Sequence, residues 1–131
     1  MNRWAIRLVA LGVFLMGGAA LQAHHAVAGV YDLNKEVVLE GRLKKLNFVN
    51  PHANIELDVP NKQTKKITTW VLTTASTNNL TRQGINKTSM KPGELLKVTV
   101  LPARNGGPTG FIRNLQLGDK SIQLFFGDGN D

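Results

Sequence analysis

The stretch EVVLEGRLKKLNF, residues 36–48, decides the fold that the sequence predicts. Its first half alternates apolar and polar residues with a period of two, as a half-buried β-strand does. The phase of the alternation changes across Lys44 and Lys45, so that the next inward-facing residues are Leu46 and Phe48. One extra residue in a strand produces such a change, and the pattern predicts a long first strand that bends at a β-bulge. A plain strand end near Lys44 is the alternative.

Further strands follow this first one at short intervals. Asn50-Pro51 interrupts the pattern, because proline lacks a backbone N–H and restricts the residue before it. Alternation resumes over residues 53–59, and a third strand is expected over residues 66–74, which are rich in Thr, Val, Ile and Trp. The third strand carries apolar side chains on both faces, which predicts a central position in the sheet. Later strands are expected around residues 96–100, 111–117 and 122–126.

One short helix is expected between the third and fourth strands. Residues 76–83 can form it, with Ser76 or Thr77 as the N-cap and Gly84 as the terminator. Three strands, a short helix and further strands, with a long bulged first strand, predict a mainly β fold, namely a small OB-like barrel of five to six strands. A small sandwich or an open meander is the alternative.

Length and composition are those of one domain. The chain has 131 residues, a net charge of +7 and no cysteine. The absence of cysteine excludes a disulfide framework, a cysteine-based zinc site, an iron–sulfur cluster and a thiol nucleophile. We expect a signal peptide at residues 1–23, the OB-like domain at 24–126 and a disordered tail at 127–131.

The signal peptide is predicted from three features of the first 23 residues. Arg3 and Arg7 precede an apolar run at residues 8–16, and small residues follow. The run is too short to span a bilayer, and no second apolar stretch follows, so we expect a periplasmic or secreted protein without a transmembrane span. Cleavage after Ala20 or after Ala23 is plausible; we favour Ala23. Removing the two arginines lowers the net charge from +7 to +5.

Several motifs of this chain resemble those of a known protein family. They are the His24-His25 start, NPH at residues 50–52, a Trp in the third strand, N-x-L-x-R-x-G at residues 78–84 and KPG at residues 91–93. In this order the chain resembles domain of unknown function 6152, a family of small exported bacterial proteins. The resemblance implies export and covers essentially the whole processed chain, but implies no particular activity. Asn54 and Ile85 depart from it, since the family often has an aromatic residue and a Trp there.

The three histidines suggest a metal site. If the peptidase cuts after Ala23, His24 carries a free α-amine beside its imidazole, and these two nitrogens can chelate one ion. His52 or His25 can supply a third nitrogen, and a three-nitrogen, tetragonal set suits Cu(II) best. The arrangement is similar to the histidine brace of exported copper proteins. The alternative is that the histidine pair is a solvated chain start and His52 packs or hydrogen-bonds locally.

The basic residues suggest a different kind of site. Lys44, Lys45 and Lys66, with Trp70 as a stacking surface, are candidates to line one side of the barrel. OB-like barrels bind oligonucleotides or oligosaccharides on such a face. Export argues against nucleic acid, so an anionic envelope ligand or a partner protein is the expected occupant of a metal-free module. The alternative is that scattered lysines only keep the protein soluble.

Catalysis has little support in the sequence. No G-x-S-x-G or H-E-x-x-H motif occurs. The carboxylates of the first two strands are expected on outer faces, where they are usually solvated. No nucleophile–base pair can be named, and we expect a binding domain rather than an enzyme.

Overall fold

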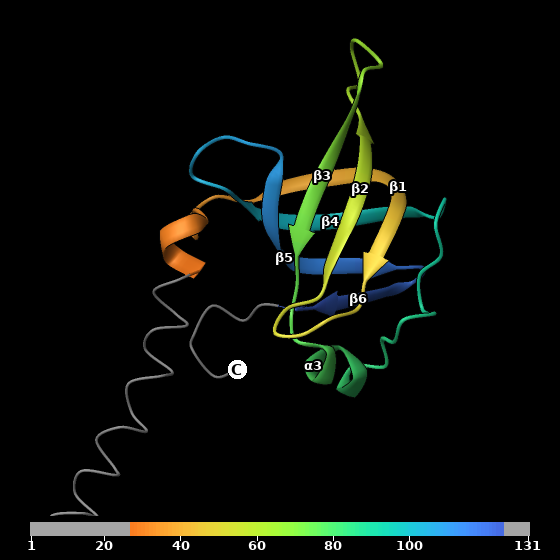
Figure 1. Cartoon of the computed structure of the whole chain (residues 1–131). Coiled ribbons are helices and arrows are strands. Elements are labelled where there is room, and N and C mark those ends of the chain that lie inside the picture. The colour runs from red at the N-terminus through yellow and green to blue at the C-terminus, as the bar shows by residue number, and fades with distance from the viewer. Residues whose placement is uncertain (1–26, 125–131) are drawn as a thin grey trace, which may run out of the picture. The chain divides into compact units, whose positions relative to one another are not determined.

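A computed structural model of the chain describes residues 27–124 (Figure 1). The chain divides into two compact units, Met1–Val30 and Tyr31–Asp131. The described part of the first unit is a helical turn at residues 27–30. Within residues 27–124, no helix has the length and apolar character needed to cross a bilayer. The predicted signal peptide, the His24-His25 pair and the predicted tail lie outside the described residues.

The described part of the second unit is a β-barrel. Its elements are β1 (Val37–Asn47), β2 (Asn54–Pro60), β3 (Ile67–Thr73), α3 (Thr77–Arg82), β4 (Leu95–Pro102), β5 (Thr109–Leu117) and β6 (Lys120–Gln123). The strands form a sheet in the order β3-β2-β1-β4-β5-β6, and β3 also pairs with β5 in parallel. That extra pairing closes the first five strands into a barrel. The connectivity, with α3 between β3 and β4, confirms the predicted OB-like fold over a sandwich or an open meander.

The long first strand bends as predicted. It pairs with β4 through Val37–Arg42 and with β2 through Arg42–Asn47. The register with β2 shifts between Leu43 and Lys45, which confirms the predicted bulge. Gly41 lies where the strand passes from one partner to the other, and a Cβ there would collide with the carbonyl oxygen of Asp58. Only glycine allows the two backbones to come this close.

The core fills the inside of the barrel and continues under α3. The helix begins at Ser76, whose Oγ accepts a hydrogen bond of 3.2 Å from the Asn79 N–H. It ends at Arg82 with Gln83 as the C-cap, and Gly84 follows with a positive φ of 80°, so the predicted N-cap Ser76 and terminator Gly84 are confirmed. Figure 1 shows α3 at the end of the barrel opposite the β2–β3 hairpin. The largest side chains with under 2% exposure are Leu43, Ile55, Leu57, Leu72, Leu80, Ile85, Leu96, Leu101, Ile112, Leu115, Leu124 and Val98.

The predicted central position of β3 in the sheet is only partly confirmed. The strand does lie between two others, β2 and β5, and Leu72 is fully buried. Its pairing with β5 covers only Val71–Thr73, however, and the side chains of Ile67 and Val71 are 66% and 45% exposed. The outward face of β3 therefore remains partly open although it carries two apolar residues, Ile67 and Val71.

Replacing Gly41 with Ala tests the close approach of β1 and β2. The added methyl group meets backbone rather than a movable side chain, so we expect the free energy of unfolding to fall by about 1–3 kcal/mol. Chemical denaturation of the purified chain measures this. A Cβ added at Gly29 would have no atom within 4 Å, so Gly29→Ala is the control and should change stability by less than about 0.5 kcal/mol. Equal stability of the two variants would contradict the role given to Gly41.

Candidate functional site

His52 occupies the corner between β1 and β2. Its side chain is exposed, and its Nδ1 lies 3.1 Å from the carbonyl oxygen of Thr74, just beyond the end of β3. A carbonyl oxygen can only accept a hydrogen bond, so Nδ1 carries the hydrogen when the ring is neutral. The other ring nitrogen, Nε2, then keeps a free lone pair. The contact both orients the imidazole and selects Nε2 as its available ligand atom.

The backbone around His52 is held on both sides. Before it, the Asn50 side-chain oxygen accepts hydrogen bonds from the Thr77 N–H (3.2 Å) and the Thr77 hydroxyl (2.7 Å). After it, Ala53 is fully buried, and its N–H donates to the Ala75 carbonyl over 3.1 Å. The corner is thus tied to the first residue of α3 and to the segment that leaves β3.

Two aromatic rings extend the site toward the start of the barrel unit. The Phe111 ring lies edge-on to His52, with ring centroids 6.1 Å apart, and the Tyr31 ring lies edge-on to Phe111 at 5.8 Å. The Tyr31 hydroxyl is 3.2 Å from the Thr73 hydroxyl, within hydrogen-bond distance. Sequence reasoning missed Tyr31. It is the only tyrosine of the chain. Its backbone forms an isolated β-bridge to Ala103, and a single bridge leaves no alternation of apolar and polar residues in the sequence.

The described residues alone do not complete a metal site. Across residues 27–124 there is no group of three His, Cys, Asp or Glu side chains that could hold an ion. His52 offers one nitrogen in a suitable tautomer. Further ligands would have to come from elsewhere in the chain, and the candidates His24 and His25 lie outside the described residues.

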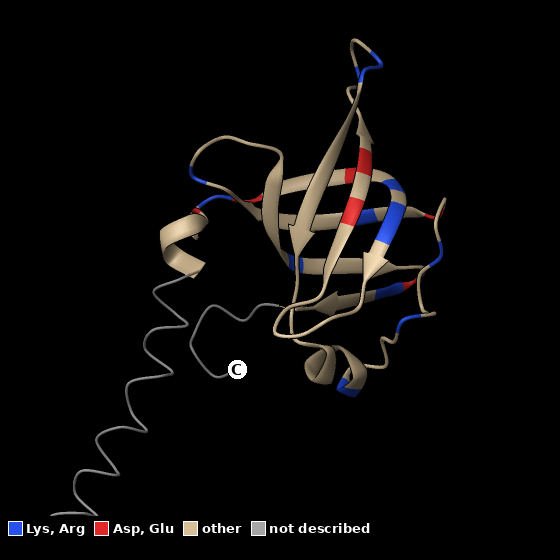
Figure 2. Ribbon diagram, viewed as in Figure 1, with Lys and Arg blue, Asp and Glu red and all other residues tan. Residues whose placement is uncertain are grey.

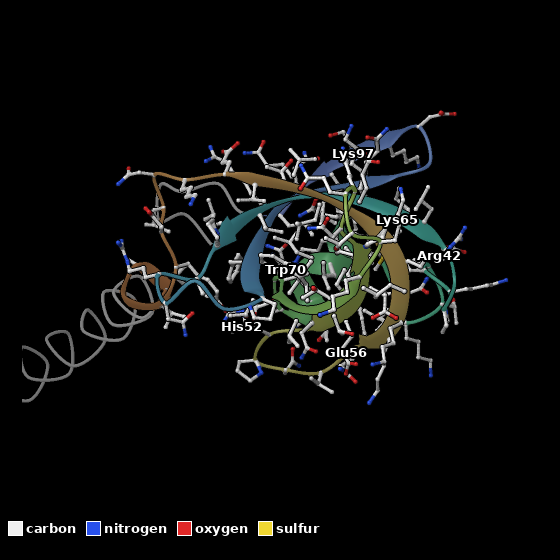
Figure 3. All side chains as sticks on the ribbon, turned by 90° about the horizontal axis from the view of Figure 1, so that it is seen from above. Arg42, His52, Glu56, Lys65, Trp70 and Lys97 are labelled. Atoms are coloured by element: carbon white, nitrogen blue, oxygen red, sulfur yellow. The ribbon has the colours of Figure 1, made fainter. Side chains whose placement is uncertain are left out.

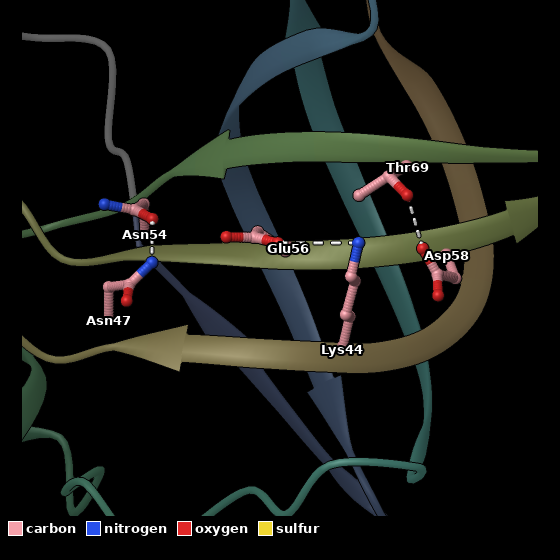
Figure 4. Close-up of polar contacts among 6 residues, drawn as sticks. All are labelled: Lys44, Asn47, Asn54, Glu56, Asp58 and Thr69. Atoms are coloured by element: carbon pink, nitrogen blue, oxygen red, sulfur yellow. Dashed lines mark hydrogen bonds and ion pairs between the residues drawn. The ribbon is translucent and has the colours of Figure 1, made fainter.

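The four residues predicted to form a basic ligand site are spread over the barrel. Lys44 lies 3.9 Å from the Glu56 carboxylate (Figure 4) and Lys45 follows it in β1. Lys66 belongs to the β2–β3 loop, about 13 Å further along β2. Trp70 is half-buried, lies inside the ring of strands in Figure 3, and borders a cleft of about 250 Å³ beside the β4–β5 loop. These residues do not make one continuous patch.

The outer face of β1, β2 and β3 carries polar pairs instead (Figure 4). The Asn47 side-chain amide donates to the Asn54 side-chain oxygen over 2.8 Å, and the Thr69 hydroxyl donates to Asp58 over 2.6 Å. Cross-strand pairs of this kind stabilise a sheet. In OB-like barrels this face often binds the ligand, but here it presents the carboxylates of Glu56 and Asp58. Lys44 is paired with the first of these two carboxylates.

Fold and site together define the chain as an OB-like barrel with a histidine at the β1–β2 corner. The chain carries a closed OB-like barrel that presents a fixed, exposed imidazole at its first corner. The comparison with family models agrees with the resemblance of the motifs: the chain belongs to the family of unknown function DUF6152, whose model matches residues 13–113. That range includes His24, His25 and the His52 corner. No curated protein and no solved structure matches the chain.

The tautomer of His52 is a direct prediction of the corner geometry. At a pH where the ring is neutral, we expect the hydrogen on Nδ1 and the lone pair on Nε2. Long-range proton–nitrogen NMR of the ring distinguishes the two tautomers. A neutral ring with its hydrogen on Nε2 would contradict the contact with the Thr74 carbonyl.

A second prediction concerns the anchoring of the corner by Asn50. Asn50→Ala removes both hydrogen bonds to Thr77, so we expect a loss of about 1–2 kcal/mol in stability and faster amide hydrogen exchange at Ala53. Asn86 accepts two similar bonds from Thr88, at 2.8 and 2.7 Å. The control Asn86→Ala should leave exchange at Ala53 unchanged. Unchanged exchange at Ala53 in Asn50→Ala would show that the corner does not need this anchor.

Proposed function

We propose that this chain is an exported OB-like binding domain that holds Cu(II) at the corner between β1 and β2. The ligands are the α-amine and imidazole of His24 and the imidazole of His52, with His25 as the alternative source of the third nitrogen. The observation that carries the proposal is the contact of His52 Nδ1 with the Thr74 carbonyl. Histidines that bind metals usually donate their other ring N–H to a carbonyl or carboxylate in this way.

The donor set favours copper over zinc. Two imidazoles and one amine provide three nitrogens in a tetragonal arrangement, which Cu(II) prefers and binds most tightly among the divalent first-row metals. A structural zinc site is closed by four ligands that usually include cysteine, and the chain has none. The rigid backbone at the corner supports the proposal, because a ligand that is already oriented loses little freedom on binding.

The proposal requires His24 to reach the corner. Residues 25–30 separate His24 from Tyr31. With residues 27–30 helical, this segment spans up to about 16 Å. The ring separations of 5.8 and 6.1 Å bring the Tyr31 ring within about 12 Å of the His52 ring.

The experiment begins with the processed protein. We expect the exported chain to start at His24, as intact mass and N-terminal sequencing would show. Cu(II) titration of this protein should give one tight site, and His52→Ala should weaken it by roughly 100-fold or more, since removing even an outer partner of a ligand costs 10–100-fold. Acetylating the α-amine of His24 removes that nitrogen as a ligand and should weaken binding similarly.

His25→Gln separates the two candidates for the third nitrogen, because with His52 as the ligand the neighbouring imidazole of His25 is not needed. It should change copper affinity by less than a few-fold. A start at Leu21, or unchanged affinity in His52→Ala, would overturn the proposal. A metal-free module that binds an anionic envelope ligand or a partner protein would then be the better account.

A further inference from the structure

The β2–β3 hairpin extends beyond the barrel. Pairing of β1 with β2 ends at Arg42 and Asp58, whereas β2 and β3 continue to pair as far as Pro60 and Ile67. The last part of the hairpin and its loop, residues 61–66, therefore have no strand of the barrel beside them. Figure 1 shows the hairpin standing above the closed barrel, and we call residues 59–67 the hairpin tip.

The tip has a defined shape because its loop bonds to itself. The Asn61 side-chain oxygen accepts the N–H groups of Gln63 and Thr64, each over 2.9 Å. The Asn61 carbonyl accepts the Lys65 N–H over 2.9 Å, and the Asn61 N–H donates to the Lys66 carbonyl over 2.8 Å. Lys65 takes the positive φ of 62° that this turn requires. The lysine side chains thus project from a fixed backbone.

The tip is cationic. Lys62, Lys65 and Lys66 are all exposed, and no acidic residue occurs between positions 59 and 70. Figure 2 shows basic residues at the tip, while the acidic residues of β2 lie lower on the hairpin. The ion pairs found within residues 27–124 join Lys44 to Glu56, Lys97 to Glu40 and Arg113 to Glu36. None of them neutralises a lysine of the tip.

Exposed aliphatic side chains flank these cations. Ile67 and Leu95 are 66% and 68% exposed. They border a groove of about 420 Å³ at the base of the tip, whose other lining residues are Glu40, Gly41, Arg42, Asp58, Pro60 and Lys62. Solvated apolar side chains beside a cluster of positive charges are typical of surfaces that lie on anionic membranes.

We propose that the hairpin tip docks on an anionic phospholipid bilayer. The three ammonium groups bind lipid phosphates, and Ile67 and Leu95 contact the boundary between headgroups and acyl chains. Each lysine near an anionic surface contributes about a fivefold gain in affinity, so three contribute on the order of 100-fold. Binding of this strength is reversible and sensitive to salt.

The composition of the tip favours lipid over other anionic partners. Binding of single-stranded nucleic acid relies on aromatic side chains that stack on the bases. Residues 59–67 contain no aromatic residue. The apolar residues at the tip are aliphatic and suit a lipid boundary.

This inference does not depend on copper. The tip and His52 lie at opposite ends of β2, which has seven residues and is about 23 Å long. Figure 3 shows Lys65 and His52 on different sides of the barrel axis. Either proposal can therefore be wrong without affecting the other.

The test uses the processed full chain and vesicles of phosphatidylcholine with or without phosphatidylglycerol. We expect co-sedimentation with the phosphatidylglycerol vesicles alone, and weaker binding as salt is raised. The triple variant Lys62→Gln/Lys65→Gln/Lys66→Gln should bind about 100-fold more weakly. The control Lys87→Gln/Lys91→Gln/Lys120→Gln makes the same change in net charge at exposed positions outside the hairpin, and should lose less than about fivefold.

A second pair of variants tests the aliphatic contact at constant charge. Ile67→Ser/Leu95→Ser should lower vesicle affinity roughly fivefold or more, because less apolar surface is removed from water. Val49 is 52% exposed in the β1–β2 loop, so Val49→Ser should have no effect. Three results would each overturn the proposal. The first is an equal loss of affinity in the two triple lysine variants, and the second is no binding of the protein to phosphatidylglycerol vesicles. The third is tighter binding to single-stranded DNA that depends on the same lysines.

Discussion

The parallel pairing of β3 with β5 is the contact on which the rest of the structure depends. It joins Val71–Thr73 to Thr109–Phe111, and it turns a sheet with two open edges into a barrel. Open edges invite pairing with other chains, so closure also protects the fold. Because the pairing uses only the last residues of β3, it brings Phe111 and the segment after β3 to the corner where β2 begins. The earlier residues of β3 lie beyond the closing point and remain in the projecting hairpin.

Closure gives the two ends of β2 opposite properties. At its beginning, the chain is held by α3, by the exit of β3 and by Phe111, and a single imidazole is fixed in one orientation. At its far end, the loop of the hairpin tip is held by hydrogen bonds within itself, and its lysines form none of the ion pairs found within residues 27–124. A rigid corner suits a ligand that demands precise geometry, such as a metal ion. An exposed cationic tip suits a broad anionic surface, because attraction to such a surface depends on the total charge of the tip more than on the exact position of each side chain.

Local patterns in the sequence predicted most of the barrel, because alternation, bulge and capping are local properties. The phase change at Lys44 located the bulge, and Ser76 and Gly84 located the ends of α3. The exposure of Ile67 could not be predicted in this way, because it depends on where β3 meets β5. His52 was identified as a candidate ligand from its type and its place after Pro51. Its hydrogen bond to Thr74 depends on residues distant in sequence, and Tyr31 was missed for the same reason.

We propose that the barrel corner and the processed amino terminus share one metal ion. A crystal structure of the processed chain with Cu(II), with anomalous diffraction measured at the copper absorption edge, tests this proposal. We expect one strong anomalous peak within bonding distance of His52 Nε2 and of the α-amine and ring of His24. Copper bound by the amino terminus with His52 Nε2 turned away, or His52 Nδ1 detached from the Thr74 carbonyl, would contradict it.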